Sequence, residues 1–368
     1  NTYDSNSEEG NHRSEQGRLS FSEMKDRQRI LFRTQGSRRI GFGHLRRCLS
    51  LAQALRSLSA ECSFLLDGDL GAQEQVVVCG FDRILVGREE DPSATAQCAR
   101  QCTASAIIVD SYRYRRKHYG ELTKTGAVVV AIQDDSRECL PVHLVVNSGP
   151  AAEKPAGNSA RDTDFLLGPR YALLRPEFVG EPERQNIPER IRRILITVGG
   201  SDPINLTPRL VSWTSRALDG VACDVVVGPL ARNTQLLESA IQKHDDSVTL
   251  HTNPSDMRAL MLSADLALCG GGQTLFELAA TGTPAVAIRT ADNQTANLKG
   301  FYGVGAIEWA GDAQDDNLEE RVIHLIIALA NDRQQRTRLS RAGRSLVDGR
   351  GSSRVAEAIL DLIARRRT

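Results

Sequence analysis

A histidine follows a glycine-rich turn near the start of the chain, and this arrangement could transfer protons beside a bound phosphate. The turn Gly41-Phe42-Gly43-His44 lies between an apolar stretch, Ile30 to Phe32, and a segment of helical periodicity, Leu45 to Leu58. Glycine lets the backbone turn sharply and approach a ligand, and the amides that begin a helix favour negative charge. Histidine ordinarily titrates close to neutral pH, as a general base requires. His44 is therefore a candidate catalytic residue, and Gly41 and Gly43 are candidate ligand-binding residues.

Two more glycine-rich turns follow apolar runs in the second half of the chain. Gly199, Gly200 and Ser201 come directly after the run Ile194–Val198, and Gly270-Gly271-Gly272-Gln273-Thr274 stands between a strand pattern and a helix pattern. Open parallel sheets bind their ligands at such strand ends. Each turn alone could be a tight turn without a ligand, but three together favour phosphate binding. None matches the Walker A pattern or the full dinucleotide fingerprint, which disfavours ATP hydrolysis and NAD chemistry.

Polar side chains near the third turn could contact a sugar. Glu277 falls on the first turns of the predicted helix, where its carboxylate could accept hydrogen bonds from a ribose diol or simply interact with solvent and the helix dipole. After the next apolar run, Asn293, Gln294 and Asn297 could present amides to sugar hydroxyls. Capping of a helix by Asp292 or Asn293 explains that cluster equally well. Both interpretations stay open.

The N-terminal half also places polar residues after apolar runs. Asp110 and Tyr112 end one predicted strand, and Asp134 follows another. Because parallel strands end at one edge of a sheet, these groups should share that edge with His44. The carboxylates could orient the histidine, or they could cap the helices that follow.

Strands and helices must position these residues, and the sequence pattern predicts two successive series in which strands and helices alternate. Strand-like and helix-like segments alternate from Arg29, and the alternation restarts after a charged, proline-containing stretch. The prediction is an α/β protein with two doubly wound domains facing each other across a cleft. Its parts are a disordered leader or cloning remnant (1–28), an N-terminal domain (29–176), a linker (177–193) and a C-terminal domain (194–368). The last helix could return to pack on the N-terminal domain.

Composition narrows the class of protein. The 368 residues are 40% hydrophobic and 25% charged, and 46 basic side chains balance 46 acidic ones. This balance argues against bulk capture of nucleic acid or an anionic membrane. The eight cysteines include no C-x-x-C pair, and no metal-ligand cluster accompanies Cys98 and Cys102. We expect a cytoplasmic protein with reduced thiols, no bound metal or cofactor and no membrane insertion.

The ordered set of motifs resembles one enzyme family. The segment RIGFGHLRRCLSL, from Arg39 to Leu51, resembles the nucleotide-sugar hydrolase of pseudaminic acid biosynthesis, which cleaves a UDP-linked diacetamido-trideoxy sugar. The resemblance extends from Arg29 over nearly the whole chain, through Ile108–Tyr112, Leu144–Asn147 and Gly168–Phe178. The C-terminal half also resembles the N-acetylglucosaminyltransferase of peptidoglycan synthesis, through GGGQTLFELAATGTPAVAI and ADNQTAN.

The resemblance implies the GT-B architecture of two Rossmann-like domains, with the nucleotide held mainly by the second. It implies that His44 is the general base and that Gly270 to Thr274 hold the diphosphate of a UDP-sugar. Glu277 would then hold the ribose, while Asn293, Gln294 and Tyr112 would face the sugar. The expected partner is this small nucleotide sugar, with a possible acceptor molecule.

The chain departs from the hydrolase pattern at residues 136–139 and 148–150, near the expected sugar and acceptor pocket. The identity of the sugar and the use of water as the acceptor therefore stay open. The alternatives are a glycosyltransferase that uses a small-molecule or glycan acceptor, and a nucleotide-sugar-binding protein without catalysis.

Overall fold

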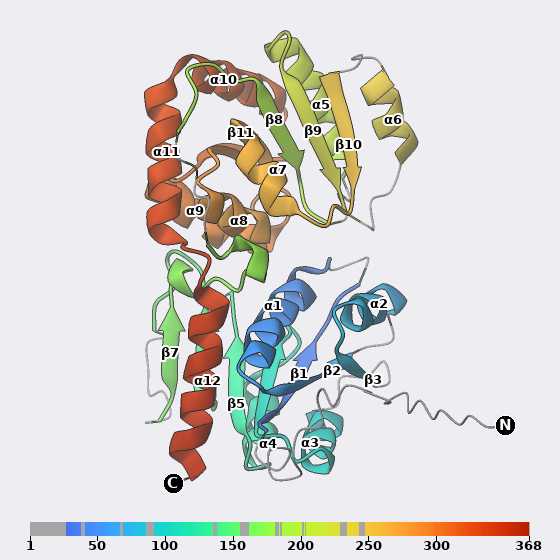
Figure 1. The fold of residues 1–368 in the computed structure, drawn as a ribbon, viewed down its shortest axis with the longest axis vertical. Coiled ribbons are helices and arrows are strands. Elements are labelled where there is room, and N and C mark those ends of the chain that lie inside the picture. Colours follow the sequence, from blue (N-terminus) through green and yellow to red (C-terminus); the bar gives the residue numbers. More distant parts are fainter. Residues whose placement is uncertain are drawn as a thin grey trace, which may run out of the picture.

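The computed structural model describes most of the chain from Arg27 onward (Figure 1). The described residues are 27–37, 41–66, 69–85, 92–134, 138–154, 162–180, 184, 186–200, 202, 204–228, 234–242 and 247–367. The predicted leader lies outside them except for its last two residues, Arg27 and Gln28.

The N-terminal domain is built on a parallel seven-stranded sheet with the order β3-β2-β1-β4-β5-β6-β7. Its strands are β1 Arg29–Thr34, β2 Glu61–Leu66, β3 Asp82–Leu85, β4 Ala106–Asp110, β5 Val128–Ile132, β6 Leu144–Asn147 and β7 Asp164–Leu167. Its helices are α1 Gly43–Ser57, α2 Leu70–Val78, α3 Pro92–Gln101 and α4 Arg116–Thr123. Apolar side chains of α1 and α2 pack on one face of the sheet, and those of α3 and α4 pack on the other. The strand order reverses between β1 and β4, where sheets of this kind form a crevice.

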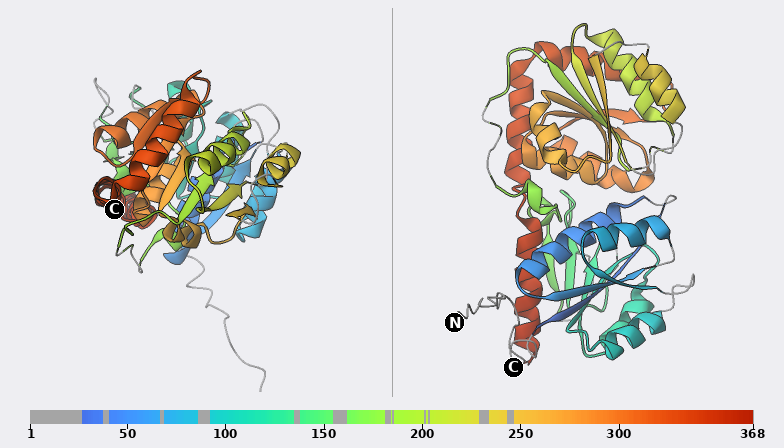
Figure 2. Two further views of the ribbon diagram at one scale, coloured as in Figure 1. Left: turned by 90° about the horizontal axis from the view of Figure 1, so that it is seen from above. Right: turned by 45° about the vertical axis from the view of Figure 1, so that its right-hand side comes forward.

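The C-terminal domain repeats this plan with a parallel six-stranded sheet, β10-β9-β8-β11-β12-β13. Its strands are β8 Arg193–Thr197, β9 Ala222–Val227, β10 Val248–Thr252, β11 Leu266–Gly270, β12 Ala285–Arg289 and β13 Glu308–Asp312. Its helices are α5 Leu206–Ala217, α6 Thr234–Gln242, α7 Met257–Ser263, α8 Gln273–Thr281, α9 Thr295–Gly303, α10 Leu318–Asn331 and α11 Arg333–Leu346. Here the strand order reverses between β8 and β11, which precede the second and third glycine-rich turns. Figure 2 shows the two domains stacked end to end.

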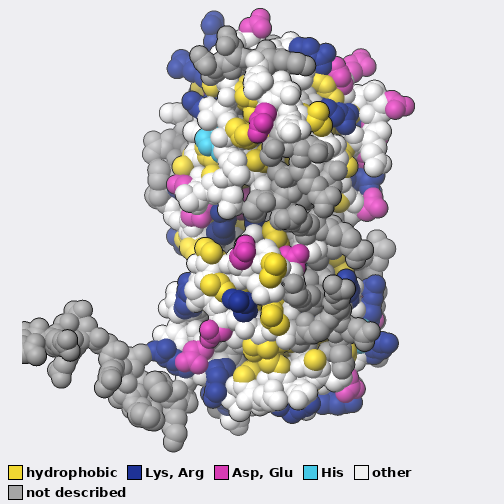
Figure 3. Space-filling model, turned by 90° about the vertical axis from the view of Figure 1, so that its right-hand side faces the viewer, with side chains coloured by type: hydrophobic (Ala, Val, Ile, Leu, Met, Phe, Trp, Pro, Cys, Tyr) yellow, Lys and Arg dark blue, Asp and Glu magenta, His cyan; other side chains and the backbone are white. Residues whose placement is uncertain are grey.

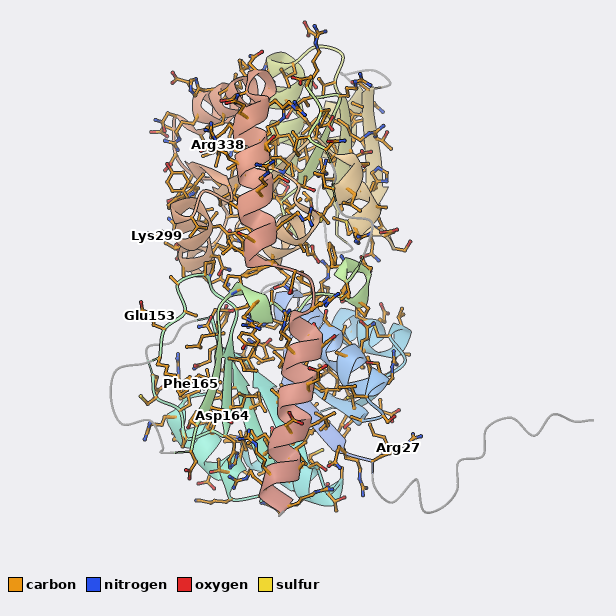
Figure 4. All side chains as sticks on the ribbon, turned by 60° about the vertical axis from the view of Figure 1, so that its left-hand side comes forward. Arg27, Glu153, Asp164, Phe165, Lys299 and Arg338 are labelled. Carbon is orange, nitrogen blue, oxygen red and sulfur yellow. The ribbon has the colours of Figure 1, made fainter. Side chains whose placement is uncertain are left out.

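The last helix, α12 (Gly351–Arg367), leaves the C-terminal domain and runs along the N-terminal one (Figure 4). Its apolar side chains, among them Val355 and Ile359, join the core under α1. At its far end Arg365 donates a hydrogen bond to Asp164 of β7 at 2.9 Å. Among the described residues, no helix combines the length and the apolar character that crossing a bilayer requires.

The chain passes between the domains twice, and the two crossings pack against each other. Pro169–Tyr171 and Pro176–Phe178 form short 3-10 helices in the first crossing. In the second, Ser352 donates a hydrogen bond to the carbonyl oxygen of Leu174 at 2.8 Å. Gly351 lies so close to the backbone of Ala172 that a side chain there would overlap its carbonyl oxygen.

The structure confirms the two doubly wound parallel sheets and adds two strands that the sequence pattern did not predict. Both lie at sheet edges: among the described residues, β3 pairs with β2 alone and β13 with β12 alone. Most residues of β3 are exposed, so this strand lacks the apolar run that marks the central strands.

Candidate functional site

The His44 side chain sits at the switch point of the N-terminal sheet and is nearly buried. It occupies the second position of α1, directly after the turn that leaves β1, and the residue is 6% exposed. Gly41 in that turn has a φ of +77°, a conformation that side chains disfavour. A side chain at Gly43 would meet open space. The turn therefore leaves room in front of His44.

His44 contacts the carboxylate that ends the neighbouring strand. Its Nδ1 atom lies 2.6 Å from Oδ1 of Asp110, the last residue of β4. Burial alone would raise the pKa of Asp110, but Arg47 and then His44 lower it, and the pKa ends well below its ordinary value. The carboxylate is therefore ionised at neutral pH and can only accept hydrogen bonds. The proton in this contact must belong to Nδ1, so in the neutral imidazole the lone pair lies on Nε2.

Arg47 joins this pair to a second carboxylate. Its Nε and Nη2 atoms donate to the two oxygens of Asp110, each at 2.6 Å, and its Nη1 donates to Asp134 after β5. Burial disfavours the charge of Arg47, yet the two carboxylates raise the pKa of the guanidinium well above its ordinary value. Burial likewise opposes the charge of Asp134, and Arg47 lowers the pKa of that carboxyl. One cation thus faces two anions beside His44.

Tyr112 connects this cluster to the other domain. Its ring meets the His44 ring edge-on, with 4.5 Å between the ring centroids. Its hydroxyl donates to Oδ2 of Asp134 at 2.5 Å and accepts a hydrogen bond from Nδ2 of Asn293 at 3.1 Å. Burial and then Asp134 raise the pKa of Tyr112, so the phenol stays protonated. Asn293 precedes α9 of the C-terminal domain, and the contact therefore spans the two domains.

A cavity of about 850 Å³ lies between the domains, within the size range of small-molecule sites. Side chains of α1 and α2 form one wall, including Arg46. The other wall comes from the ends of β8 and β9 and the start of α8, including Gly199, Thr274 and Glu277. Phe42 lines the cavity too, so the turn before His44 forms part of its edge. Figure 3 shows the side of the molecule on which α2 lies, with hydrophobic side chains gathered in its lower half.

Glu277 is mostly buried in this cavity wall and has a cationic neighbour. Its Oε1 atom accepts a hydrogen bond from Nη2 of Arg175 at 3.2 Å. Arg175 lies on the first crossing between the domains and also pairs with Glu177 at 3.0 Å. Within the part of the chain that the structure describes, the second carboxylate oxygen of Glu277 has no hydrogen-bond partner, so it can accept from other donors, such as a ribose diol.

The third glycine-rich turn is packed tightly. A side chain at Gly270 would press on the backbone of Val198, and one at Gly271 would overlap Leu298 of α9. Gly272 precedes the first residue of α8, and its carbonyl oxygen accepts from the amide of Leu275 at 3.1 Å, while the amides of Gln273 and Thr274 come too early for an acceptor within the helix. Close packing thus explains two of these glycines, while the helix start can bind an anion.

Two predicted ligand-binding amides have partners within the protein. Oε1 of Gln294 accepts hydrogen bonds from the backbone amides of Gly271 and Thr290 at 3.1 and 2.9 Å. Nε2 of Gln273 donates to the carbonyl oxygen of Leu173 at 3.0 Å. In this arrangement both side chains support the turn and the domain crossing.

The remaining predicted residues lie near these groups or outside the described part. Asn297 on α9 is half-buried, and its amide oxygen lies near Gly149 of the other domain. Gly200 packs against Gly228, whose position leaves no room for a side chain. Ser201 lies outside the described residues.

Arg47 was missed in the sequence analysis, although a signal for it exists. It stands three positions after His44, which places both side chains on one face of the helix. A cation there, facing an edge where two carboxylates were expected, could have been predicted as their partner.

No family model matches the chain, while comparison with curated proteins returns several whose names refer to sugar or polysaccharide biosynthesis. The spore coat polysaccharide biosynthesis protein SpsG of Bacillus subtilis is 30% identical over 208 residues, 55% of this chain and 59% of that protein. The UDP-2,4-diacetamido-2,4,6-trideoxy-beta-L-altropyranose hydrolase of Campylobacter jejuni is 27% identical over 196 residues, 50% of this chain and 65% of that protein. The matches thus span roughly half to two thirds of either protein.

Comparison with solved structures covers nearly the whole chain. MurG of Acinetobacter baumannii matches 91% of it with a TM-score of 0.66 at 15% identity, over 99% of its own length. The calicheamicin glycosyltransferase CalG4 matches 92% with a TM-score of 0.63 at 13% identity, over 99% of its own length. The chain has the GT-B fold. This architecture was predicted from the sequence and is confirmed.

Proposed function

We propose that the chain cleaves the bond between the anomeric carbon and the diphosphate of a UDP-sugar, with water as the nucleophile. The GT-B fold supports a nucleotide sugar as the substrate, and the similarity to a UDP-sugar hydrolase supports hydrolysis. The observation that carries the proposal is the 2.6 Å contact between His44 and Asp110 at the switch point of the N-terminal sheet.

His44 acts as the general base through its free Nε2 atom. It takes a proton from water as the oxygen attacks the anomeric carbon, and the bond to the diphosphate breaks with its electron pair leaving on UDP. Asp110 holds the ring in this tautomer and stabilises the imidazolium that forms. The surrounding charges favour this step. Arg47 contributes one positive charge and Asp110 and Asp134 two negative ones, so the imidazolium that forms neutralises a net charge of about −1.

The C-terminal domain binds the nucleotide. The start of α8 stabilises negative charge on the leaving diphosphate through its backbone amides. Glu277 accepts a hydrogen bond from the ribose, in keeping with its place in the cavity wall. Tyr112, Asn293 and Asn297 bind the sugar, since they stand where the two domains meet.

Transfer to another acceptor is the second candidate. One observation favours it: the cavity wall includes Leu70 and Val78 of α2, and both are highly exposed. Such an apolar surface could hold an acceptor molecule. It would also suit a binding protein without turnover.

Product analysis with a panel of UDP-sugars separates these functions. We expect UDP and free sugar in equal amounts without any added acceptor. Release of UDP only in the presence of an acceptor would identify a transferase. Binding of UDP-sugar without release of UDP would identify a binding protein and overturn the proposal.

A further inference from the structure

We propose that Arg47 is a positioning residue for the base: it fixes Asp110 so that His44 keeps its proton on Nδ1, and it does so from an anchor that extends into the other domain. This inference rests on the proposed role of His44 as the base. Arg47 itself touches neither the substrate nor the reacting atoms in this scheme.

The guanidinium holds Asp110 with a two-point contact. Nε and Nη2 each lie 2.6 Å from a different carboxylate oxygen, a fork geometry that sets the plane of the carboxylate. The thiol of Cys48 adds a weak donor to Oδ2 at 3.6 Å. Because Oδ1 also accepts from His44, the plane of the carboxylate sets the direction of the imidazole. A lysine could supply the charge but could not supply the fork.

Arg47 also lies close enough to His44 to make a competing hydrogen bond. Its Nη2 atom lies 3.2 Å from Nδ1 of His44, close enough to donate a hydrogen bond to that nitrogen in the other tautomer. Asp110 prevents this, since Nη2 donates to Oδ1 at the shorter distance of 2.6 Å. The contact between Arg47 and Asp110 thus selects the tautomer that leaves Nε2 free as a base.

A second anchor ties Arg47 to the domain interface. Nη1 donates to Asp134, whose Oδ2 accepts from Tyr112, whose hydroxyl in turn accepts from Asn293. The groups that face His44 are thus Arg47 from α1, Asp110 from β4, and Tyr112 and Asp134 from the loops after β4 and β5. An unbroken series of hydrogen bonds therefore links His44 to Asn293 of the C-terminal domain.

The test compares Arg47→Lys with Arg56→Lys, a control at an exposed arginine on the same helix. The first readout is the tautomer of His44, from nitrogen NMR of histidine-labelled protein in which His44→Asn assigns the signal. We expect the Nδ1-protonated form in the native protein and in the control, and a mixture of forms in Arg47→Lys. This readout needs no turnover, so it remains decisive if the proposed reaction is wrong.

The second readout is turnover against pH. We expect Arg47→Lys to lower kcat by about 10- to 100-fold, a part of what a general base supplies, with UDP affinity unchanged. An unaltered tautomer together with a native kcat would overturn the proposal. If Arg47→Lys does not fold, Asp134→Asn serves instead. Asp134 is partly exposed, and its substitution weakens the second ion pair that holds Arg47. It should produce a smaller change in both readouts, and native values of both would contradict the inference.

Discussion

Asn293 of the C-terminal domain donates a hydrogen bond to the hydroxyl of Tyr112 in the N-terminal domain, with 3.1 Å between Nδ2 and Oη. The ring of Tyr112 lies against His44, and its hydroxyl donates to Asp134. A single side chain therefore touches the candidate base, the carboxylate network and the second domain. These contacts bring Asn293, which we propose binds the sugar, within one side chain of the proposed base, and domain closure can assemble a site in this way.

Removal of this interdomain contact should weaken binding of the sugar more than binding of the nucleotide. We expect Asn293→Ala to raise KM for the UDP-sugar by about tenfold, the equivalent of one lost hydrogen bond of about 1.4 kcal/mol. The affinity for UDP alone should change less than twofold, roughly the scatter of such measurements. Calorimetric titration with UDP and steady-state kinetics with the sugar measure the two quantities. Equal losses for both ligands would argue against a role at the sugar.

Replacement of Glu277 should act on the ribose. Glu277→Gln removes the charge that Arg175 faces and weakens the acceptor offered to the ribose hydroxyls. We expect UDP affinity to fall by about tenfold, within the range for hydrogen bonds to charged groups. Affinity for 2′,3′-dideoxy-UDP should be already weak and nearly insensitive to the substitution. An equal effect of Glu277→Gln on both nucleotides would contradict a contact between Glu277 and the ribose hydroxyls.

The carboxyl of Asp110 should make stability depend on pH. Its pKa is lowered in the folded protein, so the stabilisation is present above the ordinary pKa of about 4 and is lost as the pH falls through the folded value. Asp110→Asn should cost about 3 kcal/mol near neutral pH, as expected when one partner of a buried ion pair is removed. The difference between the two proteins should shrink as the pH drops below about 4. Urea unfolding across this range measures it, and a constant difference would contradict the account.

The close packing of the two domain crossings should make Gly351 sensitive to substitution. A methyl group there would overlap the carbonyl oxygen of Ala172, so Gly351→Ala should lower the free energy of unfolding by about 1–3 kcal/mol. Gly120 on α4 is the matched control, because a side chain there meets open space and alanine favours a helix. Thermal unfolding of both variants compares them. Equal stability of the two variants would contradict this prediction, because it would show that the backbone near Ala172 shifts to accommodate the methyl group.

The sequence pattern predicted the central strands and two of the edge strands, β7 and β10, but it missed the edge strands β3 and β13. Strands such as β4 and β5 are buried along their whole length, and their continuous apolar runs mark them clearly. The edge strands β3 and β13 are partly exposed and contain polar side chains. They therefore lack the continuous apolar run that marks the central strands. Edge pairing is decided by the neighbouring strand, which the local sequence does not encode.

The candidate site divides in a similar way. The strand-end positions of His44, Asp110 and Asp134 followed from the alternation of strands and helices, because parallel strands end at one edge. The two-point contact of Arg47 with Asp110 depends on the side-chain geometry across two elements, which spacing alone cannot give. The contact of Asn293 with Tyr112 depends on how the two domains close, a relation between residues 181 positions apart.

The most direct test is turnover of the UDP-sugar by His44→Asn. The asparagine keeps a polar side chain beside Asp110 but cannot accept a proton at neutral pH. The account predicts that UDP release slows by about two to four powers of ten, while UDP affinity stays nearly unchanged. Turnover at the native rate in this variant would contradict the assignment of His44 as the base.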